Sequence, residues 1–227
     1  MLEPKLLLGI DTCGPMGSVA LGRLHGGRVE ILGQTELEGR SYSATLVAAV
    51  GDLLAANGVK VKDLGAIVVV SGPGSFTGVR VGLAAVKGLA EAAQVPVVAV
   101  SRLEVLAGKA GVASSALDAH RGEVFLRVGA AGLEARELLA GARELAAFAP
   151  APERIAVCDE AAATVLRAAW PAVALVQTVA PNATDALGLA AGRVAAGEFA
   201  DLAQLDGHYL RRSDAEIFGE PAGARSA

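Results

Sequence analysis

Three strand-like segments precede the first helix-like segment, and this order constrains the fold more than any other feature of the sequence. The segments are short apolar runs at residues 5–10, 18–23 and 28–35. Turn residues separate them, at 14–17 and at Gly26-Gly27, so a β-hairpin followed by a third strand is predicted. A dinucleotide-binding fold begins with a strand, a helix and a strand instead. The sequence therefore favours an α/β fold that opens with a β-meander.

Alternating helices and strands follow the meander. A helix is predicted at 41–56, from the apolar stripe of Leu46, Val50, Leu53 and Leu54. A buried strand at 66–70, a loop at 71–76, a helix at 77–93 and a strand at 95–100 come next. In the second half, strands are predicted at 113–117, 123–128 and 154–157, and helices at 160–169 and 183–196. The βββαβαβ order of the first hundred residues is that of actin-like domains, and the second half repeats it in outline.

Composition excludes several classes of protein. Of the 227 residues, 53% are hydrophobic and 19% are charged, which is too apolar for a disordered chain. The net charge of −4 argues against independent binding of nucleic acid, which requires a basic surface. Charges and Pro96 interrupt the longest apolar stretch, and the first residues do not resemble a signal peptide. Cys13 and Cys158 stand alone. We expect a cytoplasmic protein that does not enter the membrane.

The glycine-rich segment at residues 71–82 is the most distinctive stretch. It lies between a predicted strand and a predicted helix, where backbone N–H groups attract anions. It lacks the lysine of a Walker A loop and the third glycine of the dinucleotide motif. Two interpretations remain: a phosphate-binding loop, or a tight turn in which Thr77 caps the helix. The candidate residues for nucleotide or phosphate are Asp11, Thr12, Gly72, Gly74, Ser75 and Thr77.

Catalytic side chains are less evident. His120 lies in the polar turn at 118–123, and the other two histidines, His25 and His208, are far from it in sequence. No HxxxH or HExxH pair exists, so the sequence predicts no metal site, and an exposed turn is the favoured interpretation of His120. The serines lack the GxSxG context of a nucleophile. We therefore expect no catalytic residue.

Two predicted helices carry small residues at helical spacing. Such residues allow another helix to approach closely, which suggests a partner surface, although an alanine-rich composition explains them equally well. The helix at 41–56 has a single charge, Asp52, which is few for a free surface. The interface candidates are Ala44, Ala48, Gly51, Ala55, Gly78, Gly82 and Ala85.

Five motifs, in the same order along nearly the whole chain, resemble the TsaB/YeaZ family. The most specific is Gly72-Pro73-Gly74-Ser75-Phe76-Thr77-Gly78-Val79-Arg80-Val81-Gly82. The others are Gly9-Ile10-Asp11-Thr12, residues 100–107, residues 117–125, and Tyr209-Leu210-Arg211-Arg212. The resemblance implies two actin-like lobes of the ASKHA, ribonuclease H-like class, each a mixed sheet with helices. The expected domains are 1–105, with pairing helices at 41–57 and 77–93, and a smaller 106–227, whose last helix packs back on the first.

The resemblance also implies a function. Family members help to install threonylcarbamoyladenosine beside the anticodon of tRNAs that read codons starting with A. They are non-catalytic partners of TsaD, a threonylcarbamoyltransferase with an HxxxH metal motif, and the ATPase TsaE joins the assembly. The expected states are a heterodimer with TsaD and a homodimer without it, and tRNA is contacted mainly through the complex. No cofactor is expected on this chain alone, with ATP or ADP at the interface of the assembled complex.

The chain departs from the family pattern at two informative places. The family often has a histidine in Arg-x-His-Ser before the first helix, whereas this chain has Arg40-Ser41-Tyr42-Ser43. His208 precedes Tyr209 where the family typically has proline. Two other functions stay open: a free-standing actin-like ATPase or kinase using Asp11, Thr12 and the glycine segment, and a glycoprotease-type metallopeptidase.

Overall fold

The β-meander predicted at the start of the chain forms the edge of the first sheet. Its strands are β1 (Lys5–Asp11), β2 (Met16–His25) and β3 (Arg28–Glu38), and each neighbouring pair is antiparallel. The structure is a computed structural model that describes residues 4–38, 41–129 and 135–211. Arg40 and Arg212, each part of a motif given above, lie outside the described residues.

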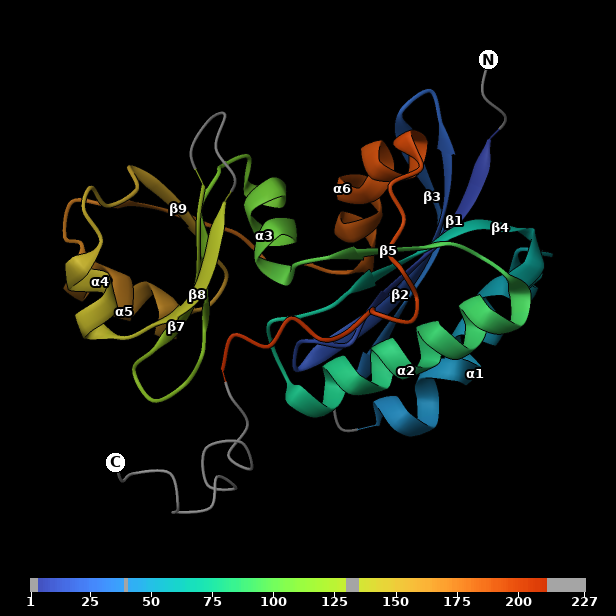
Figure 1. The fold of residues 1–227 in the computed structure, drawn as a ribbon, viewed down its shortest axis with the longest axis horizontal. Coiled ribbons are helices and arrows are strands. Elements are labelled where there is room, and N and C mark those ends of the chain that lie inside the picture. The colour runs from blue at the N-terminus through green and yellow to red at the C-terminus, as the bar shows by residue number, and fades with distance from the viewer. Residues whose placement is uncertain (1–3, 39–40, 130–134, 212–227) are drawn as a thin grey trace, which may run out of the picture.

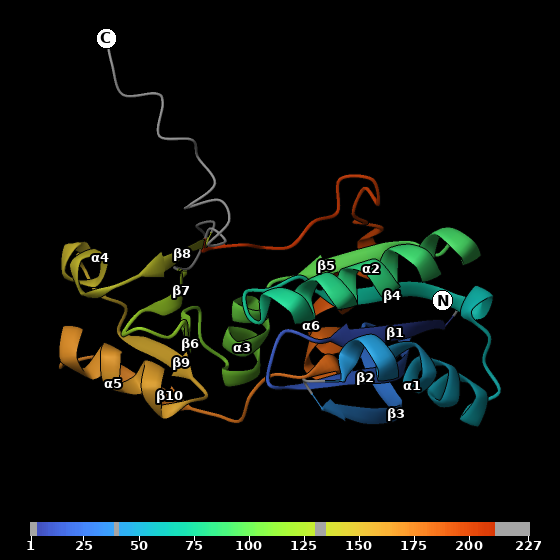
Figure 2. The ribbon, with the colours of Figure 1, turned by 90° about the horizontal axis from the view of Figure 1, so that it is seen from below.

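Two parallel strands complete the first sheet, and helices cover both of its faces. β4 (Leu64–Val70), which follows the 3-10 turn η1 (Val61–Asp63), pairs with β1, and β5 (Val97–Val100) pairs with β4. The strand order is β3-β2-β1-β4-β5. α1 (Tyr42–Ala56) and α2 (Phe76–Ala93) lie on one face, and α6 (Ala183–Ala196) lies on the other (Figures 1 and 2).

The second lobe repeats this plan. β6 (Ser115–Asp118), β7 (Val124–Val128) and β8 (Arg136–Ala140) form an antiparallel meander. β9 (Arg154–Val157) pairs parallel with β6, and β10 (Ala174–Gln177) pairs parallel with β9. The order β8-β7-β6-β9-β10 matches that of the first sheet strand for strand. Three helices belong here: α3 (Arg102–Ala110), α4 (Ala142–Ala147) and α5 (Glu160–Ala169). The expected pair of mixed-sheet, actin-like lobes is confirmed.

The lobes are connected by α3 and α6 rather than by a simple linker. The predicted division between residues 105 and 106 falls inside α3, so it would cut a helix. α6 comes late in the chain but packs against the strands of the first sheet. Two ion pairs join these helices: Lys109 of α3 pairs with Asp185 of α6 at 2.7 Å, and Glu104 of α3 pairs with Arg193 of α6. The first lobe therefore includes a segment from the C-terminal part of the chain.

Small residues bring α6 close to the sheet. A Cβ at Gly9 of β1 would lie 2.8 Å from the carbonyl oxygen of Ala183 and 2.9 Å from Leu187, closer than real Cβ atoms approach. The backbone N–H of Ala183 donates to the Ser18 hydroxyl at 2.9 Å, which anchors the start of α6 on β2. The high glycine and alanine content thus has a packing role in the core.

Among the described residues, no helix combines the length and the apolar character needed to cross a bilayer.

Candidate functional site

The loop between β1 and β2 folds around Asp11. This residue is 1% exposed, and its Oδ1 accepts a hydrogen bond from the backbone N–H of Cys13 at 2.8 Å. Burial raises the pKa of Asp11 above its ordinary value, and the Arg102 guanidinium opposes part of that rise. Burial, together with the nearby Asp11, also raises the pKa of Cys13, whose thiol donates to the Val70 carbonyl at 3.2 Å. Asp11 therefore organises its own loop.

The glycine segment packs directly on this loop. The backbone N–H of Ser75 donates to the Cys13 carbonyl at 2.8 Å, and the Thr12 hydroxyl donates to the Gly78 carbonyl at 2.7 Å. A Cβ at Gly78 would collide with the Thr12 carbonyl oxygen, and one at Gly82 would collide with the Thr12 hydroxyl. Only glycine fits at these two positions, because the turn around Thr12 occupies the space of a side chain. Parallel pairing of β1 with β4 brings the two motifs to the same sheet edge.

The six candidate residues for nucleotide or phosphate lie in different surroundings. Asp11, Thr12 and Gly72 are buried in the packing of the two loops. Thr77 is exposed but does not line the cleft described below, and it does not cap α2. The cap is Ser75, whose hydroxyl accepts from the backbone N–H of Gly78 at 3.2 Å. Of the six candidates, Gly74 and Ser75 line that cleft.

A cleft of about 1160 Å³ lies between the two lobes. The first lobe contributes the β1–β2 loop and the glycine segment, and the second contributes the ends of β6 and β9. Arg102, at the start of α3, is part of the lining although it is only 7% exposed. Phe125, Leu117 and Leu210 supply apolar wall. This volume suffices for a small organic ligand.

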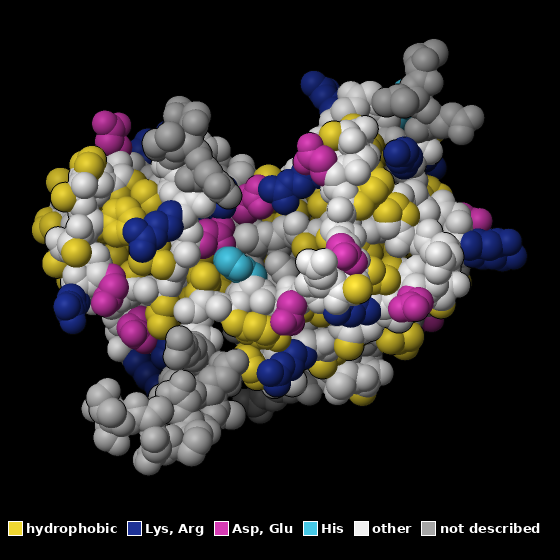
Figure 3. Space-filling model, viewed as in Figure 1, with side chains coloured by type: hydrophobic (Ala, Val, Ile, Leu, Met, Phe, Trp, Pro, Cys, Tyr) yellow, Lys and Arg dark blue, Asp and Glu magenta, His cyan; other side chains and the backbone are white. Residues whose placement is uncertain are grey.

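A segment near the end of the described chain crosses from one lobe to the other, and we call residues 199–211 the strap. Its Ala200 N–H donates to the Val97 carbonyl, and its His208 N–H donates to the Ser71 carbonyl, both at 2.8 Å. At its far end, Arg211 bonds the Ala119 carbonyl at 2.7 Å and Glu123 at 2.6 Å. Figure 3 shows a histidine side chain, in cyan, at the seam between the lobes.

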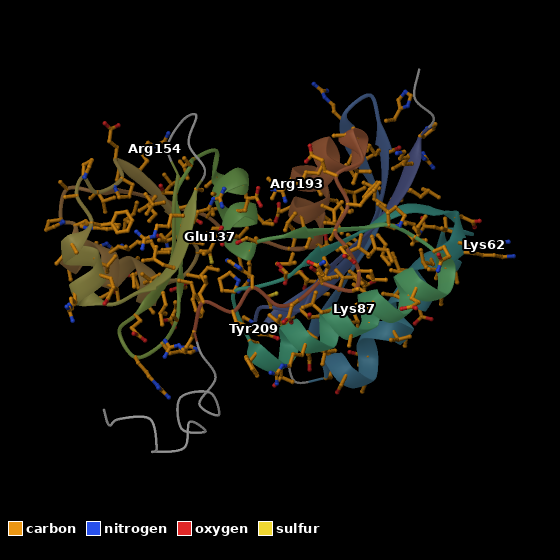
Figure 4. All side chains as sticks on the ribbon, in the orientation of Figure 1. Lys62, Lys87, Glu137, Arg154, Arg193 and Tyr209 are labelled. Atoms are coloured by element: carbon orange, nitrogen blue, oxygen red, sulfur yellow. The ribbon has the colours of Figure 1, made fainter. Side chains whose placement is uncertain are left out.

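Glu137 of β8 is the centre of the contact between the strap and the second lobe. It accepts hydrogen bonds from Ser101 at 2.6 Å and Arg127 at 2.7 Å, and it bonds His208 Nε2 at 2.8 Å. Burial by itself would raise the pKa of Glu137, but the hydrogen bonds from His208, Ser101 and Arg127 outweigh it and leave the pKa below its ordinary value. Figure 4 shows Glu137 on β8 near the first lobe and Tyr209 beside the start of α2.

Tyr42 and Tyr209 each contact one loop of the first lobe: Tyr42 contacts the β1–β2 loop, and Tyr209 contacts the glycine segment. The Tyr42 hydroxyl donates to the Gly14 carbonyl at 2.8 Å, and burial raises the pKa of Tyr42 to about 12. The Tyr209 ring lies 4.9 Å from that of Phe76, centroid to centroid, and Arg80 stacks 3.7 Å above the Phe76 ring. The departure at Tyr42 therefore has a structural role: its side chain fixes the β1–β2 loop.

The polar turn that holds His120 stays at the surface. The His120 side chain is 87% exposed, and its Nδ1 lies 2.8 Å from Asp118. Across the described ranges, no group of three or more histidines, cysteines or carboxylates is arranged to hold a metal ion. The placement of His120 thus agrees with the interpretation as an exposed turn.

The predicted partner face is present on α1 but only in part on α2. Ala44, Ala48, Gly51 and Ala55 are all exposed, and Val47 on the same side is 62% exposed. Gly78 and Gly82 are buried and face Thr12, and Ala85 is half-buried, so the expectation that both glycines lie on the outer side of α2 is wrong. The rotation of α2 instead exposes a stripe of Ala84, Gly88 and Ala92.

Comparisons with known proteins converge on one group. A family model described as TsaD, tRNA N6-adenosine threonylcarbamoyltransferase, matches residues 34–139. A curated relative from Escherichia coli, named tRNA threonylcarbamoyladenosine biosynthesis protein TsaB, is 37% identical over 125 residues, which is 52% of each chain. One of the same name from Bacillus subtilis is 41% identical over 90 residues, 38% of this chain and 39% of its own. The chain thus spans about half or less of the length of these curated relatives.

A solved structure extends the similarity to nearly the whole chain. The structure titled YeaZ from Pseudomonas aeruginosa is 31% identical to this chain, with a TM-score of 0.69. The match covers 91% of this chain and 100% of that one. A match over 91% of the chain extends into both lobes.

Proposed function

Because this chain belongs to the TsaB/YeaZ family, we propose that it takes part in the synthesis of threonylcarbamoyladenosine in tRNA. The curated relatives are named for that pathway, and the matching family model is named for the transferase of the same modification. The part of the chain that this model covers includes α1, the glycine segment and α3.

In this proposal the chain is a non-catalytic partner of a TsaD-type threonylcarbamoyltransferase. Its Asp11 and Thr12, which an actin-like ATPase would turn toward a nucleotide, are engaged with Cys13 and Gly78 instead. The sequence has three histidines, at 25, 120 and 208, and no HxxxH pair. The ATPase TsaE joins the assembly, ATP or ADP binds at its interface, and tRNA is held mainly by the complex. Without its partner the chain forms a homodimer.

The exposed face of α1 is the observation that carries the pairing proposal. It presents Ala44, Ala48, Gly51 and Ala55 to the surface with the exposed Val47 beside them. Small side chains allow the backbone of a partner helix to come close, and an exposed apolar residue among them gains from being covered. Solvent-facing helices normally carry more charge than the single Asp52 of this helix.

Replacement of Ala48 by arginine tests the pairing surface. Ala48 is exposed, and arginine is a good helix former, so the fold should be unaffected while the bulky cation blocks close approach. Co-purification with the TsaD-type transferase should be lost. The matched control is Ala168→Arg on α5 of the second lobe, also an exposed helical alanine, which should co-purify normally. Retention of the transferase by Ala48→Arg would count against this surface.

A further inference from the structure

Arg102 is a buried cation without a close counter-ion. Its side chain is 9% exposed, and within the described part of the chain its Nε is buried and has no hydrogen-bond partner. The ion pair with Asp11 is long, 3.9 Å from Nε to Oδ2, which is beyond hydrogen-bond distance. The other oxygen of Asp11 is already used by the Cys13 N–H. A buried charge with one long ion pair and an unpartnered N–H is costly, so this position favours an acceptor beyond those that the described residues supply.

The guanidinium is held at the edge of the cleft between the lobes. The backbone N–H of Arg102 donates to the Gly72 carbonyl at 2.6 Å, which fixes the start of α3 against the glycine segment. A Cβ at Gly14 would collide with Nη2 of Arg102, so the β1–β2 loop leaves room for this side chain only because residue 14 is glycine. Arg102 and Gly14 both line the cleft. The charge is therefore in a built position that opens into a cavity large enough for an organic molecule.

The charges around the cleft favour a ligand with a single negative charge. Three acids, Glu38, Asp118 and Asp159, also line it, and Asp11 lies behind Arg102. The lining has two further cations: Arg211, which is paired with Glu123, and Arg121, which is exposed to solvent. These acids would repel a multiply charged phosphate more strongly than a monoanion. A carboxylate has one charge, and its planar oxygens match the fork of the guanidinium.

We propose that the cleft between the lobes binds a small organic acid, whose carboxylate accepts hydrogen bonds from Arg102. The apolar body of the acid lies against Phe125, Leu117 and Leu210, the apolar part of the lining. This site is distinct from the outer face of α1, and it does not depend on the proposed role in tRNA modification.

The direct test is an NMR titration of the isolated full-length protein at constant ionic strength, with the arginine Nε–Hε signals as the readout. Sodium acetate and sodium benzoate are the carboxylate probes, and inorganic phosphate is the competing anion. The Arg102 signal should shift and saturate with acetate, and benzoate should bind more tightly because its ring covers apolar wall. A stronger response to phosphate than to acetate, or no saturable shift with any of the three, would overturn the proposal.

Two variants and one chemical probe complete the test. Arg102→Gln should weaken benzoate binding by about tenfold or more, since hydrogen bonds to a charged group are worth about 1.5–3 kcal/mol. Arg121→Gln, at an exposed cleft residue, should change the Kd of benzoate by less than about threefold. Benzoate should also slow alkylation of Cys158, which lines the cleft, in the unmodified protein, where Cys13 is buried. This last measurement decides the matter without any variant; unchanged alkylation at saturating benzoate contradicts the site.

Discussion

Replacement of Gly78 by alanine should destabilise the protein strongly, because the added Cβ would collide with the Thr12 carbonyl oxygen. A backbone atom cannot rotate away, so the loop must shift. Overpacking of this kind costs about 1–3 kcal/mol. The shift also strains two hydrogen bonds, from Thr12 to the Gly78 carbonyl and from Ser75 to the Cys13 carbonyl, each worth about 1 kcal/mol. Alanine returns up to about 1 kcal/mol of helix propensity. The net loss is about 2–4 kcal/mol.

Urea denaturation and thermal melting measure this loss. For a protein of this size, about 2–4 °C of Tm is lost per kcal/mol, so the Tm should fall by about 5–15 °C. Gly88→Ala is the matched control, because Gly88 is exposed on the same helix and its added Cβ meets nothing within 4 Å. That variant should be as stable as the unmodified protein or up to about 1 kcal/mol more stable. Equal stability of Gly78→Ala and Gly88→Ala would refute the packing role of the glycine segment.

Three further predictions concern buried polar contacts. Gly82→Ala should destabilise less when combined with Thr12→Ala, because that change removes the hydroxyl with which the new Cβ collides; strictly additive losses of unfolding free energy would contradict the contact. Tyr42→Phe should cost about 1 kcal/mol from the lost bond to Gly14. Folding raises the pKa of Tyr42 to about 12 from the ordinary value of 10.0, so the unmodified protein should lose stability as pH rises from about 10 to 12. Tyr42→Phe should lose less stability over that range, as measured by urea denaturation. Folding lowers the pKa of Glu137, so the stability that Glu137 contributes is present above its ordinary pKa of 4.5 and is lost as pH falls through the folded-state value. Glu137→Gln should therefore reduce the loss of unfolding free energy at acidic pH. An unchanged loss in this variant would argue against the hydrogen bonds to Glu137.

The secondary structure with strong patterning is predictable from the sequence. β9, α5 and α6 have the bounds that the periodicity predicts, and the three strands of the opening meander are within a few residues of theirs. The predictions do not include α3, α4, β8 and β10. Three of these elements have only four to six residues, which is too short for a periodic signal. The fourth, α3, lies where the sequence predicts the division between the two domains.

The orientation of α2 shows why the partner face was only partly predictable. In a helix made largely of glycine, alanine and valine, the small residues form stripes on more than one side. Only the contact of Gly78 and Gly82 with Thr12 determines which stripe faces inward. That contact depends on the pairing of β1 with β4, which joins residues more than 50 positions apart.

The sequence does not reveal that Arg102 and His208 belong to the cleft, because their places depend on contacts with residues far away in sequence. Arg102 resembles any charged residue at the start of a helix, and its burial follows from the approach of the β1–β2 loop. His208 acquires its role from Glu137, 71 positions away in sequence. A signal was nevertheless present for Arg102: it lies in one of the five motifs that resemble the family, directly after the strand that ends at Val100.

Quantification of threonylcarbamoyladenosine in cellular tRNA by mass spectrometry most directly tests the proposed role. In cells depleted of this protein, the modified nucleoside should fall to background. It should return on expression of the unmodified protein or of the Ala168→Arg control, and it should stay low with Ala48→Arg. An unchanged level of threonylcarbamoyladenosine after complete depletion would contradict a role of this chain in the modification.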